Sequence, residues 1–157
     1  MLIGGLQKLT LIDYPGKLAA TVFCLGCNFR CPFCYNRELV LPAEIKNQPK
    51  ISEKDFFDFL KERKNLLEGI CITGGEPTIY KDLPDFIKKI RKLGYLVKLD
   101  TNGSNPAMLR DLIASRMLDI SGIPPVIAKK LIDYVAMDIK APIGAKMKNA
   151  KCKNQND

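Results

Sequence analysis

Residues 21–34 read TVFCLGCNFRCPFC, and they indicate both the fold class and the position of a site. Residues 21–25 are almost entirely apolar, which is typical of a strand buried in a parallel sheet. Four of the six cysteines in the chain lie in this stretch, at Cys24, Cys27, Cys31 and Cys34. A buried strand that leads directly into a cysteine-rich loop indicates metal or redox chemistry at the end of that strand.

Four kinds of metal or redox site could use cysteines at such close spacing. Zinc sites built from two C-x2-C pairs usually have the pairs roughly 15–20 residues apart, and here they are much closer. A bacterial ferredoxin has the order C-x2-C-x2-C-x3-C-P, which this segment lacks. A thioredoxin-type C-x2-C motif needs no third or fourth thiol. A fourth possibility, which leaves the others open, is a [4Fe-4S] cluster on Cys27, Cys31 and Cys34, with Cys24 as a buried strand residue and one iron open to a small molecule.

Extended and helical patterns alternate in the segments around this stretch. Residues 6–12 and 18–25 read as two strands joined by a turn, and residues 36–51 read as a loop. Three later strands are expected at 70–73, 95–99 and 134–139. Helices are expected from Ser52 to Gly69, from Pro84 to Gly94, after Asn105-Pro106 and after Pro124-Pro125. Alternating strands and helices predict an α/β fold with a parallel sheet.

Polar or glycine-rich segments follow each expected parallel strand. They are the cysteine loop, then Gly74-Gly75-Glu76-Pro77, Asp100-Thr101-Asn102-Gly103, and Asp138 with Lys140. Because the carboxyl ends of parallel strands meet at one edge of the sheet, these segments predict a common ligand site.

The composition narrows the chemistry. The chain has 157 residues and no histidine, which excludes Ser-His-Asp and Cys-His nucleophiles and zinc held by histidine. Lys and Arg outnumber Asp and Glu by 25 to 17, giving a formal net charge of +8. Without a signal peptide or an apolar run of about 20 residues, we expect a cytoplasmic protein with no membrane partner. The basic segment 146–157 is interpreted as a solvated, disordered tail, so nucleic-acid binding is not expected.

Two motifs resemble those of the radical S-adenosylmethionine (SAM) superfamily. Cys27-x3-Cys31-x-Phe33-Cys34 is similar to the cluster-binding signature, in which an aromatic residue precedes the third cysteine. Gly74-Gly75-Glu76-Pro77 is similar to the glycine-rich motif for the methionine amino group. The resemblance implies a partial (β/α) barrel, a [4Fe-4S] cluster with three cysteine ligands, and SAM bound to the open iron.

Longer segments resemble the activating proteins of anaerobic ribonucleoside-triphosphate reductase, which are glycyl-radical-enzyme activases. These segments are residues 5–17 and 27–36, and residues 100–103 and 137–140 resemble strand-end motifs of such activases generally. The resemblance implies a glycyl radical enzyme, anaerobic ribonucleotide reductase, as partner and flavodoxin or ferredoxin as electron donor. It also implies reductive cleavage of SAM to a 5′-deoxyadenosyl radical that takes hydrogen from a glycine, chemistry that requires no protein acid or base.

The resemblance also assigns roles to individual residues, and each role has a simpler structural alternative. Cys27, Cys31 and Cys34 hold the cluster. Gly74, Gly75 and Glu76 lie against SAM, or form a plain turn. Phe33 and Tyr35 flank the adenine, or pack locally, and Cys34 between them also belongs to the expected cofactor-binding residues.

The last two strand ends complete the expected site. Asp100, Thr101 and Asn102 bind the ribose or the methionine carboxylate, or form a helix cap and turn. Asp138 and Lys140 share one face of their strand and contact SAM, or form an ordinary ion pair. By resemblance to other activases, Asp100, Thr101 and Asp138 surround a monovalent cation. Cys71 and Cys152 are expected to have no role.

The resemblance covers residues 4 to about 142, whereas family members continue through further strands. We therefore expect a radical SAM partial barrel with an N-terminal hairpin over residues 1–145, truncated after about four barrel strands, and reduced activity. Two other functions stay open: a radical SAM enzyme acting on a small molecule, similar to a deazaguanine synthase, and an inactive Fe-S-binding fragment.

Overall fold

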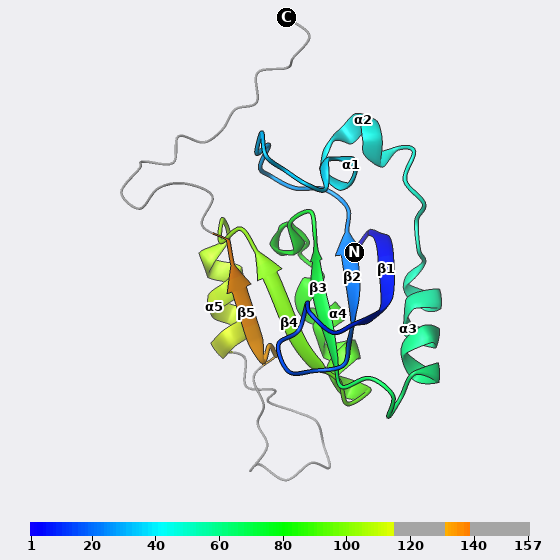
Figure 1. The fold of residues 1–157 in the computed structure, drawn as a ribbon. Helices are drawn as coiled ribbons and strands as arrows, with labels where there is room; N and C mark the ends of the chain where they lie inside the picture. Colours follow the sequence, from blue (N-terminus) through cyan, green and yellow to red (C-terminus); the bar gives the residue numbers. More distant parts are fainter. Residues whose placement is uncertain (115–130, 139–157) are drawn as a thin grey trace, which may run out of the picture.

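The sheet has five strands in the order β1-β2-β3-β4-β5 (Figure 1). The computed structural model describes residues 1–114 and 131–138. The strands are β1 (Ile3–Thr10), β2 (Ala19–Cys24), β3 (Gly69–Gly74), β4 (Leu96–Thr101) and β5 (Tyr134–Met137). β1 pairs with β2 in antiparallel orientation, and the pairs from β2 to β5 are all parallel. The predicted α/β class with a parallel sheet is confirmed.

Helices connect the parallel strands. They are α1 (Arg37–Val40), α2 (Pro42–Ile45), α3 (Glu53–Glu62), the 3-10 helix η1 (Pro77–Ile79), α4 (Leu83–Lys92) and α5 (Pro106–Ala114). The sequence signals for two starts are confirmed. The Ser52 hydroxyl accepts a hydrogen bond from the amide of Asp55, and the Asn105 side chain accepts one from the amide of Met108. No helix within residues 1–114 and 131–138 is long and apolar enough to cross a membrane.

Several predicted boundaries were wrong. The expected loop 36–51 contains α1 and α2, since Pro42 is a favourable first residue for a helix as well as a breaker. The helix that starts after Ser52 ends at Glu62, because Asn65 adopts a positive φ of 69° and turns the chain toward β3. Gly69 is the first residue of β3 and not the end of a helix.

The end of β4 also differs from the prediction. Asp100 and Thr101 belong to the strand, because they pair with Ala136 and Met137 of β5. The expected helix after Pro124, together with Ile139, Lys140, Cys152 and the basic tail, lies outside the described residues.

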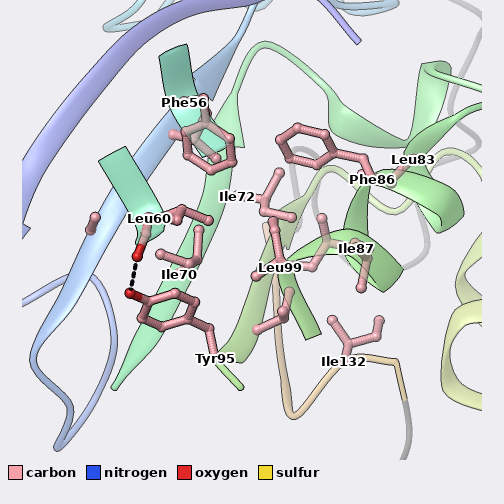
Figure 2. Packing of buried hydrophobic residues seen from close by; sticks show 14 of the residues in the cluster. Phe56, Leu60, Ile70, Ile72, Leu83, Phe86, Ile87, Tyr95, Leu99 and Ile132 are labelled. Atoms are coloured by element: carbon pink, nitrogen blue, oxygen red, sulfur yellow. Dashed lines mark hydrogen bonds between the residues drawn. The ribbon is translucent and has the colours of Figure 1, made fainter. Parts of the chain in front are cut away.

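The core lies between one face of the sheet and helices α3, α4 and α5. Alternate strand residues point to this face, and each is fully buried: Ala20, Val22, Ile70, Ile72, Val97 and Leu99. Phe56 of α3 stacks on Phe86 of α4 with ring centroids 5.3 Å apart, and the Tyr95 hydroxyl donates to the Leu60 carbonyl at 2.6 Å (Figure 2).

The same alternation sends the other strand residues to the opposite face of the sheet. These residues are more polar, and they include Thr21, Cys71, Lys98 and Asp100. The apolar and polar faces are therefore separated by the strand period, which leaves the polar face and the strand ends for a site.

Candidate functional site

A cavity of about 320 Å³ lies where the four parallel strands end. Its walls come from the loop after β2, the ends of β3 and β4, and the residue after β5. The lining residues are Cys27, Phe29, Cys31, Phe33, Cys34, Tyr35, Asn36, Val40, Thr73, Gly74, Gly75, Glu76, Asp100, Thr101, Asn102 and Asp138. Every predicted site residue that the structure describes borders this one cavity. Its volume is in the range of small-molecule sites.

The three loop cysteines, Cys27, Cys31 and Cys34, are each partly exposed along the cavity wall. The Cys27 sulfur accepts hydrogen bonds from the amide of Phe29 at 3.3 Å and from the side chain of Asn102 at 3.8 Å. Partial burial raises the pKa of Cys27, while the Phe29 amide acts in the opposite direction.

The three cysteines of this loop are chemically suitable ligands for a metal cluster, although their sulfurs do not converge on one point. Three soft thiolate donors border one cavity, and thiolates are the usual ligands of Fe-S clusters. Within residues 1–114 and 131–138, no three Cys, Asp or Glu side chains lie close enough to hold a metal ion.

Cys24 and Cys71 differ from the loop cysteines because both are fully buried within the strands. Burial raises the pKa of each thiol to about 12. For Cys71 the nearby Asp100 carboxylate raises it further, since a second negative charge is unfavourable there. Neither residue lines the cavity, so both are separated from the cysteines of the loop.

Alkylation should separate these two classes of thiol. We expect iodoacetamide at pH 8 to label Cys27, Cys31 and Cys34 of the native, iron-free protein well before Cys24 and Cys71. A thiol with a pKa of about 12 is ionised to roughly one part in ten thousand at pH 8, and the thiolate is the reactive form. Peptide mass spectrometry over time measures the rates, with guanidine-unfolded protein as the control that labels all sites. Equal native rates would contradict the burial.

The glycine pair at the end of β3 lies against the start of the cysteine loop. Gly74 has a positive φ of 107°, and a Cβ there would lie 2.5 Å from the Cys24 nitrogen. A Cβ on Gly75 would lie 1.8 Å from the carbonyl oxygen of Gly26. The Gly75 amide donates to the Cys24 carbonyl at 2.9 Å. Both glycines therefore have a structural requirement that is independent of any ligand: they permit backbone contact between two loops of the site.

Glu76 is nearly fully buried, and its carboxylate accepts four hydrogen bonds. Oε1 accepts from the amide and hydroxyl of Thr78, at 3.0 and 2.5 Å, and from the Thr101 hydroxyl at 2.7 Å. Oε2 accepts from the amide of Asn102 at 2.7 Å. The side chain thus links the end of β3 to the end of β4. Sequence reasoning placed Glu76 at the site but did not anticipate this link.

We expect Glu76→Gln to destabilise the fold by about 1–3 kcal/mol, the usual cost of an unmade buried hydrogen bond. The amide NH2 must replace one oxygen, and it would then face the N–H of either Thr78 or Asn102. Urea unfolding followed by circular dichroism measures the change. Glu44→Gln is the control because Glu44 is exposed on α2. An equal, small effect in both variants would contradict a structural role for the Glu76 carboxylate.

The cysteine loop is also tied to the loop after β4. The Asn102 side chain donates to the side chain of Asn28 at 3.0 Å, and Asn28 donates to the Ser104 hydroxyl at 2.7 Å. Asn102 was predicted to bind a ligand, and that role stays a prediction; its side chain lines the cavity and also contacts Cys27 and Asn28. Asn28 was not singled out from the sequence, because nothing in its spacing marks it.

The aromatic residues of the loop lie at the rim of the cavity. Phe33 is 59% exposed and Tyr35 is 98% exposed, so neither packs in the core. Across the cavity, the amide of Asp138 donates to the Thr101 carbonyl at 3.0 Å, which continues the β4–β5 pairing. Binding of an adenine between the rings of Phe33 and Tyr35 stays a prediction.

Comparison with known families resolves the class of protein. The family model described as the radical SAM superfamily matches residues 21–138, which include every wall of the cavity. The chain belongs to the radical SAM superfamily. Membership in this superfamily implies a [4Fe-4S] cluster and SAM, and the thiolate-lined cavity at the strand ends fits both.

Three relatives show how far the similarity extends. A Methanocaldococcus jannaschii protein provisionally named a glycyl-radical enzyme activating enzyme is 34% identical over 158 residues, which is 99% of this chain and 57% of that protein. A protein of Saccharolobus islandicus provisionally named a GTP 3′,8-cyclase is 34% identical over 88 residues, 55% of this chain and 26% of its own length. The crystal structure of QueE from Escherichia coli shares the fold, with a TM-score of 0.53 and 21% identity over 66% of this chain and 52% of that chain. This radical SAM chain spans about half the length of the first of these relatives.

Proposed function

We propose that this chain is the SAM-binding part of a glycyl-radical-enzyme activase, and that the enzyme activated is an anaerobic ribonucleotide reductase. The observation that carries the proposal is the 34% identity with the M. jannaschii relative along 99% of this chain. That match includes the N-terminal hairpin β1–β2, whereas the cyclase match covers 55% of the chain. The resemblance of residues 5–17 to ribonucleotide reductase activators lies in β1 and in the turn that joins β1 to β2.

The residues of the chain hold and shield the reactants. When bound, a [4Fe-4S] cluster and SAM would supply one-electron reductive cleavage of the sulfonium, the chemistry that precedes hydrogen abstraction from a substrate. Cys27, Cys31 and Cys34 hold the cluster, and the hydrogen bonds from Phe29 and Asn102 to Cys27 set the electron density on that sulfur. The backbone of Gly74 and Gly75 forms the wall beside the amino acid end of SAM. No residue transfers a proton, which is consistent with the absence of histidine.

The positive charge supports an acidic flavoprotein or ferredoxin as electron donor. The chain carries a formal net charge of +8, and flavodoxin-type and ferredoxin-type donors are attracted to such surfaces at low ionic strength.

A second candidate is an enzyme that acts on a small molecule. Its support is the fold shared with QueE and the partial identity with the cyclase. Both similarities cover only part of the chain, 55% for the cyclase and 66% for QueE, whereas the activating-enzyme relative matches 99% of it, so they do not favour a small substrate over a protein substrate.

The test is anaerobic reconstitution of the chain with iron and sulfide, followed by dithionite and SAM. We expect 5′-deoxyadenosine by chromatography and, after addition of an anaerobic ribonucleotide reductase, a glycyl radical by electron paramagnetic resonance. 5′-Deoxyadenosine without a glycyl radical on any glycyl radical enzyme would favour the small-molecule class. Iron binding without 5′-deoxyadenosine would indicate an inactive Fe-S fragment.

A further inference from the structure

A buried lysine lies beneath the wall of the cavity and was not singled out from the sequence. Lys98 in β4 is 7% exposed, in a strand that is otherwise apolar up to Asp100. Its ammonium lies 2.5 Å from Oδ1 of Asp100 and 3.7 Å from the Cys71 sulfur. It also lies over the ring of Tyr134, 5.9 Å from the centroid.

Buried lysines are rare and need a compensating partner, because an unpaired charge in the interior is strongly unfavourable. Burial alone lowers the pKa of Lys98, but the contacts with Asp100 and Cys71 raise it overall. The side chain is therefore a fixed positive charge on the polar face of the sheet. Asp100, its ion-pair partner, lies between it and the cavity.

Asp100 is the link between this charge and the cavity. Its side chain borders the cavity, and both of its oxygens are already engaged. Oδ1 accepts from Lys98 and Oδ2 accepts from the Cys71 thiol at 3.4 Å. The Thr101 hydroxyl, on the other face of β4, donates to Glu76. The monovalent-cation site expected around Asp100, Thr101 and Asp138 stays a prediction, and the contacts show that the protein itself supplies a positive charge beside Asp100.

We propose that Lys98 is a positioning residue that supplies the counter-charge of Asp100, so that the cavity accepts the carboxylate of the amino acid part of SAM without a bound monovalent cation. The proposal rests on the proposed binding of SAM in this cavity. Without Lys98, the carboxylate of Asp100 would lie at the cavity of an anionic ligand group without the positive charge that now lies beside it. With it, the Lys98–Asp100 pair is neutral as a whole, and its burial limits screening by solvent.

The test measures binding to the cluster-loaded chain in its oxidised state, where no turnover occurs. Equilibrium dialysis gives the affinity for SAM and for 5′-methylthioadenosine, which has the nucleoside but no amino acid group. Each is measured in choline chloride and in KCl or NaCl. The variants are Lys98→Met and Lys98→Arg. Lys88→Met is the matched control, because Lys88 is an exposed lysine paired with Asp85.

We expect the unmodified chain to bind SAM equally well in all three salts. Lys98→Met should lose about 10- to 100-fold in SAM affinity in choline chloride, the range of one charged hydrogen bond, and recover at least part of it in KCl or NaCl. Its affinity for 5′-methylthioadenosine should change less than about twofold, while Lys98→Arg and Lys88→Met should stay near the unmodified chain.

Three results would overturn the role of Lys98. They are a K⁺ or Na⁺ requirement in the unmodified chain, unchanged SAM affinity in Lys98→Met, and equal losses for both ligands, which would indicate general structural damage. The salt series on the unmodified chain decides the first point even if Lys98→Met does not fold. Failure of the cluster-loaded, unmodified chain to bind SAM would instead overturn the proposed function, and the role of Lys98 with it.

Discussion

Replacing any one of Cys27, Cys31 and Cys34 with alanine is expected to abolish cluster binding, whereas Cys24→Ala should keep it. The three loop thiols border the cavity, while Cys24 is fully buried in β2 with a pKa of about 12. Losing one of three ligands removes a bond that no other nearby thiol can replace. Iron content after anaerobic reconstitution, together with the visible absorbance of the cluster, measures the result.

Cys71→Ala is the matched control for the cysteine series. Cys71 is also fully buried, and it lies on β3 away from the cysteine loop. It should therefore retain iron like the unmodified chain, even if it is less stable. Equal loss of iron in Cys24→Ala and in the loop variants, with Cys71→Ala unaffected, would contradict the three-ligand assignment and favour a four-thiolate site.

Gly75→Ala is expected to cause a large loss of both stability and SAM binding. The added methyl group would lie 1.8 Å from the Gly26 carbonyl oxygen, and 2.6 Å from its carbon. Because both are backbone atoms, no side-chain rotation relieves the contact, and the loops after β2 and β3 must separate. We expect a loss of about 3 kcal/mol or more in the free energy of unfolding, and SAM binding too weak to detect.

Gly5→Ala provides the control for Gly75→Ala. A Cβ on Gly5 would be 3.5 Å from the Phe23 side chain, an ordinary van der Waals distance, so we expect a change of about 1 kcal/mol or less. Urea unfolding and equilibrium dialysis with SAM measure both variants. A Gly75→Ala chain with the stability and SAM affinity of the unmodified chain would show that the close approach is not required.

The parallel sheet and the place of the site could be predicted from the sequence because they depend on short, regular patterns. The apolar run at 21–25, the glycines after β3 and the Asn105 cap each specify one local structure. Parallel pairing then requires the strand ends to meet, so the shared cavity followed from the order of elements alone.

The direction of individual side chains could not be predicted in the same way. Glu76 belongs to a motif expected to face SAM, yet its carboxylate turns inward because four donors from neighbouring loops surround it. Those donors belong to Thr78, Thr101 and Asn102. The last two are 25 and 26 residues from Glu76 in the sequence, and only the tertiary fold brings them to its carboxylate.

The pairing of Lys98 with Asp100 could have been predicted from the sequence, whereas the contact of Lys98 with Cys71 could not. A single lysine inside an apolar strand, two residues before Asp100 and therefore on the same face, is an available signal. The Cys71 thiol on the adjacent strand becomes visible only once the β3–β4 register is known.

Hydrogen bonds at the cavity connect the loops after β2, β3 and β4 to one another. These connections bear on how such a site can change during evolution. Gly75 binds Cys24, Glu76 binds Asn102, and Asn102 returns to Asn28 in the cysteine loop. A substitution at one position alters the partner's geometry as well as its own, so tolerated changes in one loop require matching changes in the next. We therefore expect paired substitutions across two of these loops to be better tolerated than either substitution alone.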